Sequence, residues 1–344
     1  FPIGRLGINK LKALIAKIRR TSKSNYDCVV GVSGGVDSTY TLYLAKKFGL
    51  RPLAVHVDNG WNSELAVNNI EKITKNLEID LHTIVLDWPT FREIQLAFLR
   101  ASVPDGEIPT DLSIQSGLFA AASEFNIKYI INGHNFRAQG TCPIGWTYMD
   151  GKYLMDVSRR FSEADLNKFP NLNILNLIYY SLFKRVKTVS LLEYMDYDRN
   201  AVTKFLTEKL GWRAYGGKHY ESTYTKFFQG FILMEKFGID KRKIHLSSQI
   251  RSGKIDRTTA IKSLKKSPFD ISILDSEIAY VTKKFRITIN DFNKIISSPI
   301  KSFRDYKSYF PLIQLLSPFI YIFCKLGFLP MRFYKKYATD VATL

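Results

Sequence analysis

The sequence predicts an α/β protein with a doubly wound, mainly parallel sheet and a mostly helical C-terminal region. Short apolar runs that suit buried strands alternate with helical patterns over the first 150 residues. A glycine-rich turn follows the first of these runs, and the strand pattern stops near residue 150. Alternating strands and helices are typical of parallel βαβ units, in which ligands bind beyond the carboxyl ends of the strands.

The elements follow from apolar periodicity taken in chain order. Residues 6–20 repeat apolar positions at helical spacing and predict a helix before the sheet. Strands are expected at 26–32, 52–57, 81–86 and 128–132, and helices at 39–48, 63–77, near 90–102 and 112–125. No strand is expected past about 150, and 171–300 should be mostly helical. We therefore divide the chain into a sheet domain with its N-terminal helix at 1–150, a helical substrate or partner region at 151–298, and a basic aromatic segment at 299–344.

Composition limits the partners and the compartment. The formal charge of +19 favours polyanions in general, including nucleic acid, nucleotide-sugars, ATP and anionic membranes, and does not choose among them. Cys28, Cys142 and Cys324 form no CxxC pair, which argues against a disulfide framework or a structural zinc site and predicts a cytoplasmic location. Since the sequence begins at Phe1, without a signal peptide, we expect further residues upstream.

The segment 299–344 contains an apolar run from Phe310 to Leu329. Gln314, Pro318 and Lys325 interrupt it, so it does not predict a membrane span. We expect this run to be buried against the protein's own helices. Docking to a partner or to the inner face of a membrane is the alternative.

The six residues Ser33-Gly34-Gly35-Val36-Asp37-Ser38 lie between the first strand and the first sheet helix. Two glycines let backbone N–H groups approach a phosphate, and the helix N-terminus adds partial positive charge. The serine hydroxyls can donate to the same oxygens, and Asp37 can hold Mg²⁺. Neither GxxxxGK[ST] nor GxGxxG is present. An ordinary turn with Ser38 as the helix N-cap is the alternative.

This SGGxDS turn resembles the PP-loop of the N-type ATP pyrophosphatases. The resemblance implies cleavage of ATP between its α and β phosphates and adenylation of a substrate oxygen. It implies that Ser33, Gly34, Gly35, Asp37 and Ser38 cradle the pyrophosphate, and that Val32 and the strand end at His56–Asp58 border the adenosine. Asp58 is equally explained as a plain turn residue.

The segment Gly133-His134-Asn135 follows the strand at 128–132. In PP-loop enzymes this segment lies across the nucleotide, with Gly133 beside it. His134 is a candidate for donating to a phosphate or orienting the substrate carbonyl, against the alternative of a structural histidine. Asn135 and Trp146 are candidate substrate contacts. Trp146, like Tyr148, is also explained by plain packing.

A second informative stretch, 211–266, mixes glycines, histidines, acids and many cations in connections between helices, a costly mixture to bury without ligands. With the PP-loop, its GGKHxES and KFGIDKRKxHLS segments resemble the N-acetyl sugar amidotransferase family of bacterial surface-polysaccharide synthesis. The resemblance, over about 25–266, implies that ATP adenylates the amide oxygen of a nucleotide-linked N-acetyl sugar, and that ammonia then displaces AMP. The candidate residues are Lys218, Lys241 and Arg242 for charge neutralisation, His219 and Glu221 for metal binding or proton transfer, and Lys226 and Lys243 for substrate. Glu221 could instead pair with Lys218, and the whole stretch could be a solvated basic face.

The resemblance also implies the partners and the rival functions. Ammonia is expected from a separate glutaminase, similar to the glutaminase and cyclase subunits of histidine biosynthesis. The sequence departs from the family pattern in two ways. It lacks the cysteine-rich segment that often precedes the PP-loop, and it has Gly-His-Asn where family members often have Gly-Glu-Asn. One rival is tRNA thiolation, with Cys142 carrying sulfur, but no CxxC pair or RNA-binding module supports it. The other is a non-catalytic nucleotide-binding protein.

Overall fold

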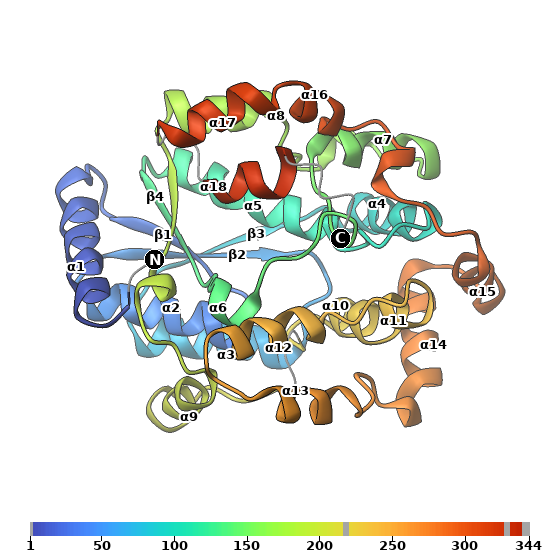
Figure 1. Cartoon of the computed structure of the whole chain (residues 1–344), viewed down its shortest axis with the longest axis horizontal. Coiled ribbons are helices and arrows are strands. Elements are labelled where there is room, and N and C mark those ends of the chain that lie inside the picture. Colours follow the sequence, from blue (N-terminus) through green and yellow to red (C-terminus); the bar gives the residue numbers. More distant parts are fainter. Residues whose placement is uncertain (1–2, 216–219, 327–330, 339–344) are drawn as a thin grey trace.

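A five-stranded, fully parallel sheet runs through the middle of the computed structural model, which describes residues 3–215, 220–326 and 331–338 (Figure 1). Its strands are β1 (Cys28–Gly31), β2 (Pro52–Asp58), β3 (Leu81–Val85), β4 (Tyr129–Asn132) and β5 (Lys187–Ser190). The order is β3-β2-β1-β4-β5, so the winding direction changes between β1 and β4. The predicted doubly wound sheet is confirmed, and ligands are expected at this switch point.

Strand β5 contradicts the expectation that strands stop near residue 150. Its four residues pair in parallel with β4, with Ile131 opposite Val189. The strand is short, polar and largely exposed at the sheet edge, so it lacks the apolar run that identifies a buried strand. Tertiary pairing, not local pattern, places it in the sheet.

Helices cover both faces of the sheet, and those of the N-terminal half lie close to their predicted positions. They are α1 (Gly4–Thr21), α2 (Val36–Lys47), α3 (Glu64–Asn76), α4 (Trp88–Arg100) and α5 (Ile108–Glu124). Alternate strand residues face opposite ways: Val30 packs in the core beside α2 and α3, and Val29 packs against α5. Figure 1 shows α2 and α3 below the sheet and α5 above it.

The rest of the chain is mostly helical, as predicted. The longer helices are α7 (Gly151–Phe161), α9 (Arg199–Leu210), α12 (Arg242–Arg251), α13 (Arg257–Leu264), α14 (Leu274–Phe285) and α15 (Ile289–Ser297). The shorter ones include α6 (Phe136–Gln139), α8 (Ile174–Ile178), α10 (Thr223–Phe227), α11 (Leu233–Glu235), α16 (Phe310–Leu315), α17 (Ser317–Lys325) and α18 (Met331–Phe333), with π-helical turns η2 (Tyr179–Phe183), η4 (Phe228–Ile232) and η7 (Tyr334–Ala338). An aromatic core joins several of these helices to α4, for example where Phe98 of α4 packs edge-on against Tyr153 of α7 with ring centroids 5.4 Å apart.

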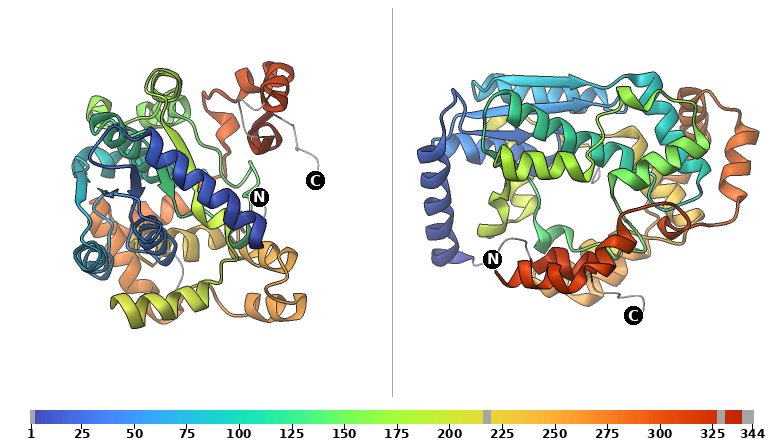
Figure 2. Two further views of the ribbon diagram at one scale, coloured as in Figure 1. Left: turned by 90° about the vertical axis from the view of Figure 1, so that its left-hand side faces the viewer. Right: turned by 90° about the horizontal axis from the view of Figure 1, so that it is seen from above.

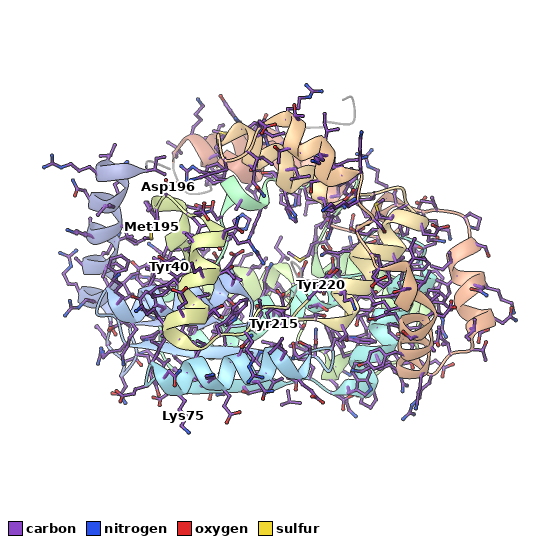
Figure 3. All side chains as sticks on the ribbon, turned by 90° about the horizontal axis from the view of Figure 1, so that it is seen from below. Tyr40, Lys75, Met195, Asp196, Tyr215 and Tyr220 are labelled. Atoms are coloured by element: carbon purple, nitrogen blue, oxygen red, sulfur yellow. The ribbon has the colours of Figure 1, made fainter. Side chains whose placement is uncertain are left out.

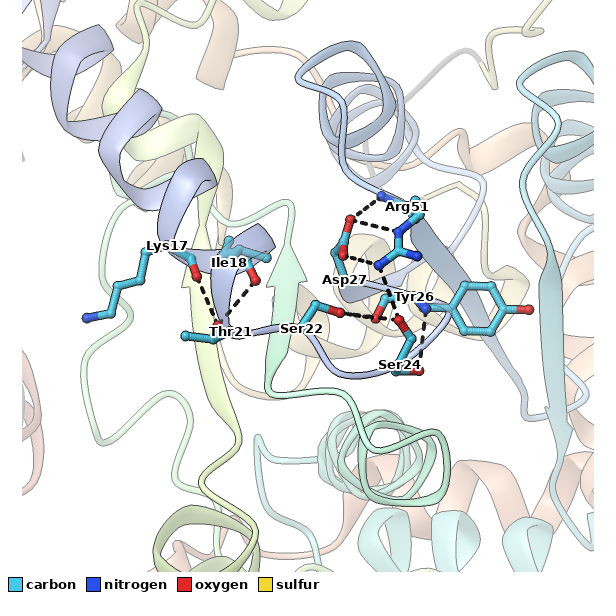
Figure 4. Close-up of polar contacts among 8 residues, drawn as sticks. All are labelled: Lys17, Ile18, Thr21, Ser22, Ser24, Tyr26, Asp27 and Arg51. Atoms are coloured by element: carbon cyan, nitrogen blue, oxygen red, sulfur yellow. Dashed lines mark hydrogen bonds and ion pairs between the residues drawn. The ribbon is translucent and has the colours of Figure 1, made fainter.

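The start of β1 is fixed by a buried acid (Figure 4). Asp27 accepts hydrogen bonds from the Arg51 backbone N and from Arg51 Nη2, both at 2.8 Å, directly before β2. Burial would raise the pKa of Asp27, but the hydrogen bonds and charge of Arg51 outweigh it and hold that pKa below its usual value. The pair therefore aligns β1 with β2, which brings their carboxyl ends together.

The expected burial of the 310–329 run is wrong for most of the part that the structure describes. Leu315 is 75% exposed and Phe319 is 61% exposed, although Cys324 is buried. Within the described residues, α16 and α17 present a broad apolar surface, because few described side chains pack over it. Over the described residues, no helix is both long and apolar enough to cross a bilayer.

Candidate active site

The SGGxDS turn connects β1 to α2 at the switch point. Helix α2 begins at Val36 with Gly35 as its N-cap, so Ser38 lies in the first turn and is not the cap. The Ser38 hydroxyl accepts from Ser33 N at 3.2 Å and donates to Gly35 O at 3.1 Å. The two serine oxygens lie 3.2 Å apart. The turn thus brings both hydroxyls and the unpaired N–H groups of a helix start to one point, an arrangement suited to phosphate.

Glycines are required where this turn meets its neighbours. Gly34 has a φ of +78°, and a Cβ there would lie 2.6 Å from Ala66 O. A Cβ on Gly133 would lie 2.8 Å from the backbone carbonyl of Asp37. The loop after β4 can therefore approach the start of α2 closely only because it has glycine at this position.

Side chains from distant parts of the chain surround Asp37. Tyr197 donates to its Oδ1, Gln139 Nε2 donates to its Oδ2 at 3.1 Å, and Arg199 Nη1 lies 3.8 Å from Oδ2. Tyr197 and Arg199 come from the start of α9, and Gln139 ends α6. These donors fix the orientation of the carboxylate and leave its other lone pairs for a cation.

The PP-loop backbone is held from behind by the segment after α9. Trp212 Nε1 and Tyr215 Oη both donate to Gly34 O at 2.7 Å, and Trp212 is buried. Asn69 of α3 donates to Tyr215 Oη at 3.0 Å. Seen from below, Tyr215 and Tyr220, which flank the undescribed residues 216–219, lie near the middle of the molecule (Figure 3). These hydrogen bonds fix the position of the Gly34 carbonyl.

Two adjoining cavities open at this edge of the sheet. The smaller, of about 260 Å³, is lined by Ser33, Asp37, Ser38, Gly133 and Arg199 among others. The larger, of about 850 Å³, extends from Val32 past Thr110 to Lys241. Ser33, Gln139 and Glu221 line both. A phosphate-sized pocket therefore joins a cleft large enough for a nucleotide and a second ligand.

His56 and Asp58 support the cleft wall. Asn62 Nδ2 lies 3.2 Å from His56 Nε2 and donates to Asp58 Oδ1 at 3.1 Å. Because an amide nitrogen only donates, His56 Nε2 accepts and its Nδ1–H donates to Val32 O at 3.0 Å. Asp58 also accepts from Gly60 N at 2.8 Å, as in an Asx turn, which favours the turn interpretation. His56 and Val32 line the cleft, as do the unpredicted Asn59 and Asn62.

The segment after β4 contributes one side chain to the cleft and one to the scaffold. The side chain of His134 lines the cleft, and the backbone N–H of His134 donates to Asn132 Oδ1 at 3.2 Å. Asn135 is 2% exposed, caps α6 by accepting from Arg137 N, and donates to Leu192 O at 3.3 Å. The structure thus places Asn135 behind the surface as a cap, while His134 faces the ligand space.

Lys241 lies at the far end of the cleft. Its Nζ is 2.8 Å from Glu107 Oε2, which also accepts from Gln229 Nε2 at 2.7 Å. Burial favours the neutral amine, but the charge of Glu107 prevails and raises the pKa of Lys241. An ammonium paired with a carboxylate therefore lines the cleft, which suits a polar substrate group.

Other predicted residues lie elsewhere. Arg242 makes a bidentate pair with Asp240, Lys226 pairs with Glu277 at 2.5 Å, and Lys243 is exposed. None of these three is among the residues lining the cavities described above. Trp146 packs against the aromatic core, so its candidate substrate contact is not brought to the cleft. Lys218 and His219 lie outside the described residues, and with them the alternative pair between Lys218 and Glu221.

Cys142 lines the cleft near Lys241, as the thiolation alternative requires. Burial raises the pKa of its thiol above the ordinary value. This shift disfavours the thiolate, which is the form that acts as the nucleophile in sulfur transfer.

The carboxylates present fit a cation only if phosphate supplies further ligands. Among the described residues, no cluster of three or more His, Cys, Asp or Glu side chains could hold a metal by itself. Asp37 and Glu221 both line the phosphate-sized pocket. Mg²⁺ commonly binds through one or two carboxylates together with nucleotide phosphates and water, and these two residues match that pattern.

Sequence reasoning missed Tyr197, Arg199 and Gln139, and it gave no role to Trp212 and Tyr215, which lie in the stretch 211–266 that it had singled out. The last described helical turns contribute three further residues to the cleft lining that were not predicted, namely Phe333, Lys336 and Tyr337. These residues lie far in sequence from the PP-loop, and each has an ordinary local context. Only knowledge of which segments meet in space would have singled them out.

Two family models match separate parts of the chain. Residues 27–113 match the model of the queuosine biosynthesis protein QueC, and residues 221–317 match that of an LPS biosynthesis protein WbpG-like, C-terminal domain. Uncharacterized protein MJ1599 of Methanocaldococcus jannaschii is 33% identical over 113 residues, 32% of this chain and 38% of that protein. A probable mitochondrial tRNA-specific 2-thiouridylase of Caenorhabditis elegans is 29% identical over 31% of this chain and 32% of its own length. The chain thus matches only about a third of the length of either relative.

Two solved structures show the extent of structural similarity. The NH3-dependent NAD synthetase of Campylobacter jejuni matches with a TM-score of 0.36 and 15% identity, over 86% of this chain and 98% of its own. The NMN synthetase of Francisella tularensis matches with a TM-score of 0.39 and 14% identity, over 86% and 97%. The SGGxDS turn, its place between β1 and α2, and the two family matches together support a PP-loop protein that is similar to the N-acetyl sugar amidotransferases.

Proposed function

We propose that this protein is an ATP-dependent, ammonia-using amidotransferase that converts the acetamido group of a nucleotide-linked sugar into an acetamidino group. The observation that carries the proposal is the pair of adjoining cavities that share Ser33, Gln139 and Glu221. One cavity has the geometry of an anion site, and the other has room for a second substrate beside the nucleotide. The WbpG-like match over 221–317 covers residues that line both.

The chemistry divides into two steps. The amide oxygen of the sugar attacks the α-phosphorus of ATP, and pyrophosphate leaves. Ammonia then adds to the activated carbon, the C–O bond breaks, AMP leaves, and loss of one proton gives the amidine in its protonated, amidinium form. Adenylation is needed because an amide oxygen is itself a poor leaving group.

Each group of the site has a part in this scheme. Ser33, Ser38 and the start of α2 bind the departing pyrophosphate, and Asp37 and Glu221 would hold Mg²⁺, which neutralises phosphate charge when bound. Arg199 faces the same pocket. His134 lies at the junction, where it can orient the acceptor, and the pair Glu107–Lys241 is positioned for the polar end of the sugar nucleotide.

Ammonia is expected to come from a separate glutaminase with a cyclase-like subunit. Free ammonium at high concentration should therefore replace that partner. Hydrolysis of glutamine by the purified chain would contradict this part of the proposal.

The decisive experiment is mass spectrometry of UDP-N-acetylated sugars incubated with the protein, ATP, Mg²⁺ and ammonium. The expected product carries NH in place of one oxygen, and AMP forms in equal amount. AMP release that depends on tRNA would instead support thiolation. Absence of turnover with every acceptor would support a non-catalytic nucleotide-binding role.

A further inference from the structure

Two apolar segments, distant in sequence, are left uncovered in the structure. The first is α8 with η2, residues 174–183, where Leu175 is 71% exposed and Phe183 is 76% exposed. The second is α16 with α17, residues 310–325, which contains Leu315 and Phe319. Other exposed members are Ile174, Leu177, Ile178, Leu182, Leu312, Leu316, Ile322 and Phe323. We call these two segments together the apolar face.

Both segments lie on the same side of the molecule. Figure 1 shows α8, α16 and α17 along its upper edge, and the left view of Figure 2 shows the yellow-green and the red helices at the top again, side by side with a gap between them. They therefore form two parallel contact areas and do not cover one another. A flat, extended partner can touch both at once, whereas a single peptide groove cannot account for them.

The two stretches of chain that carry the apolar face have charges of one sign. No Asp or Glu occurs from residue 166 to 192 or from 306 to 339. The cations of these two stretches are Lys168, Lys184, Arg185, Lys187, Lys307, Lys325, Arg332, Lys335 and Lys336. Exposed Leu and Phe side chains among Lys and Arg, with Tyr between them, are typical of helices that lie in a membrane interface.

We propose that the apolar face docks the protein on an anionic phospholipid bilayer, with the helices lying in the interface and not crossing it. A second copy of the chain is a poorer occupant, because it would bring an identical cationic rim against this one. An acidic lipid surface matches both the exposed apolar side chains and the surrounding charge. Docking at the apolar face would also take place close to the cleft. Gln314 Nε2 of α16 donates to the backbone O of Tyr337 at 2.6 Å, and Tyr337 lines the cleft.

Vesicle co-sedimentation tests this proposal, with phosphatidylcholine alone compared with phosphatidylcholine plus phosphatidylglycerol. The wild-type protein should bind the anionic vesicles, and binding should weaken at high salt. The double variants Leu175→Ser/Phe183→Ser and Leu315→Ser/Phe319→Ser should each lower the partition coefficient on the order of ten-fold or more. These exposed positions should leave the thermal unfolding temperature nearly unchanged.

The matched control is Val85→Ser/Ile271→Ser, since both side chains are 72% exposed and lie outside the apolar face. It should bind vesicles like the wild type. The proposal fails if the wild type does not bind anionic vesicles, or if the control loses as much binding as the test variants. It also fails if the wild type is a dimer in sedimentation velocity that the same Ser substitutions dissociate, because the face then binds a second copy.

Discussion

Asp37 is the residue in which sequence pattern and structural context agree most closely. Its carboxylate lies in the first turn of α2 and receives hydrogen bonds from Tyr197 and Gln139. These two contacts orient the side chain toward the pocket that Ser33 and Ser38 also line. An oriented carboxylate beside a phosphate site is suited to hold a bridging cation without reorganisation.

Replacement of Asp37 by Asn should abolish catalysis and leave the fold intact. The amide cannot supply the negative charge, so AMP and pyrophosphate formation should fall at least ~100-fold, a loss typical of a removed electrostatic group. Release of AMP from labelled ATP measures it. Asp256→Asn, at the exposed N-cap of α13, is the control and should retain full activity. Retained turnover in Asp37→Asn would contradict its assigned role.

Asp105 gives a pH dependence that can be tested. It is 3% exposed, and burial raises its pKa to about 7, against the opposing effect of hydrogen bonds from Tyr148 N and Tyr153 Oη. Between its ordinary value of 3.8 and about 7 the folded state therefore binds a proton that the unfolded state has lost. The free energy of unfolding should fall as pH rises through this window, by on the order of a few kcal/mol.

Asp105→Asn should reduce this dependence by the share of Asp105, because its neutral amide does not titrate. Burial also raises the pKa of Asp111 to about 7, so the share of Asp111 should remain. Urea denaturation at pH 5 and pH 8 compares the two proteins. The exposed Asp275→Asn should keep the wild-type difference between the two pH values. An Asp105→Asn protein with an unchanged difference would show that another group causes the fall.

At the scale of elements, the PP-loop depends on a segment nearly 180 residues away. Trp212 and Tyr215 both donate to Gly34 O, and Asn69 holds Tyr215. The turn itself has a left-handed glycine and no side-chain N-cap, so its conformation is not fixed by local sequence alone. The loop that follows α9 therefore acts as a brace for the anion site.

Trp212→Phe should test this brace. The ring volume is largely kept while the indole N–H is lost, so stability should drop by about 1–3 kcal/mol and the KM for ATP should rise. Chemical denaturation and AMP release measure the two effects. Trp88→Phe, in the aromatic core beside Trp61, is a control that should affect stability without changing the KM for ATP. A Trp212→Phe protein with wild-type KM would mean that the loop does not need the brace.

The elements that sequence predicted well are those whose pattern is local. The buried strands β1 and β2 and the SGGxDS turn can each be recognised from a few consecutive residues. Strand β5 was not predicted, because its run Lys187-Thr188-Val189-Ser190 is mostly polar. Its place in the sheet comes from pairing with β4. Tyr197 and Arg199 were not predicted for a related reason, because their contacts with Asp37 join positions some 160 residues apart. The exposed side chains of α16 and α17 could not be predicted either, because an apolar run alone normally indicates burial.

At the scale of the whole molecule, the cleft is enclosed by the first and the last parts of the described chain. Val32 and His56 form one end, and Phe333, Lys336 and Tyr337 of α18 and η7 contribute to the wall. The nucleotide end belongs to the sheet, and the opposite end depends on the C-terminal helical turns. Changes in these turns should therefore affect the acceptor more than ATP.

Tyr337→Ala should raise the KM for the sugar nucleotide about ten-fold and leave the KM for ATP unchanged, because only the distant wall loses contact area. Tyr334→Ala, in the same η7 turn but packed on Tyr321, is the matched control. Steady-state kinetics with each substrate varied in turn separates the two. An equal rise in both KM values would show that the wall is not specific for the acceptor.

The position of Phe333, Lys336 and Tyr337 in the cleft also has a consequence for biosynthesis of the protein. During translation, the sheet and the PP-loop emerge from the ribosome long before these residues do. A nascent chain can thus assemble its ATP end while the opposite wall is still being synthesised, and the reaction chamber closes only when nearly all of this sequence has been made.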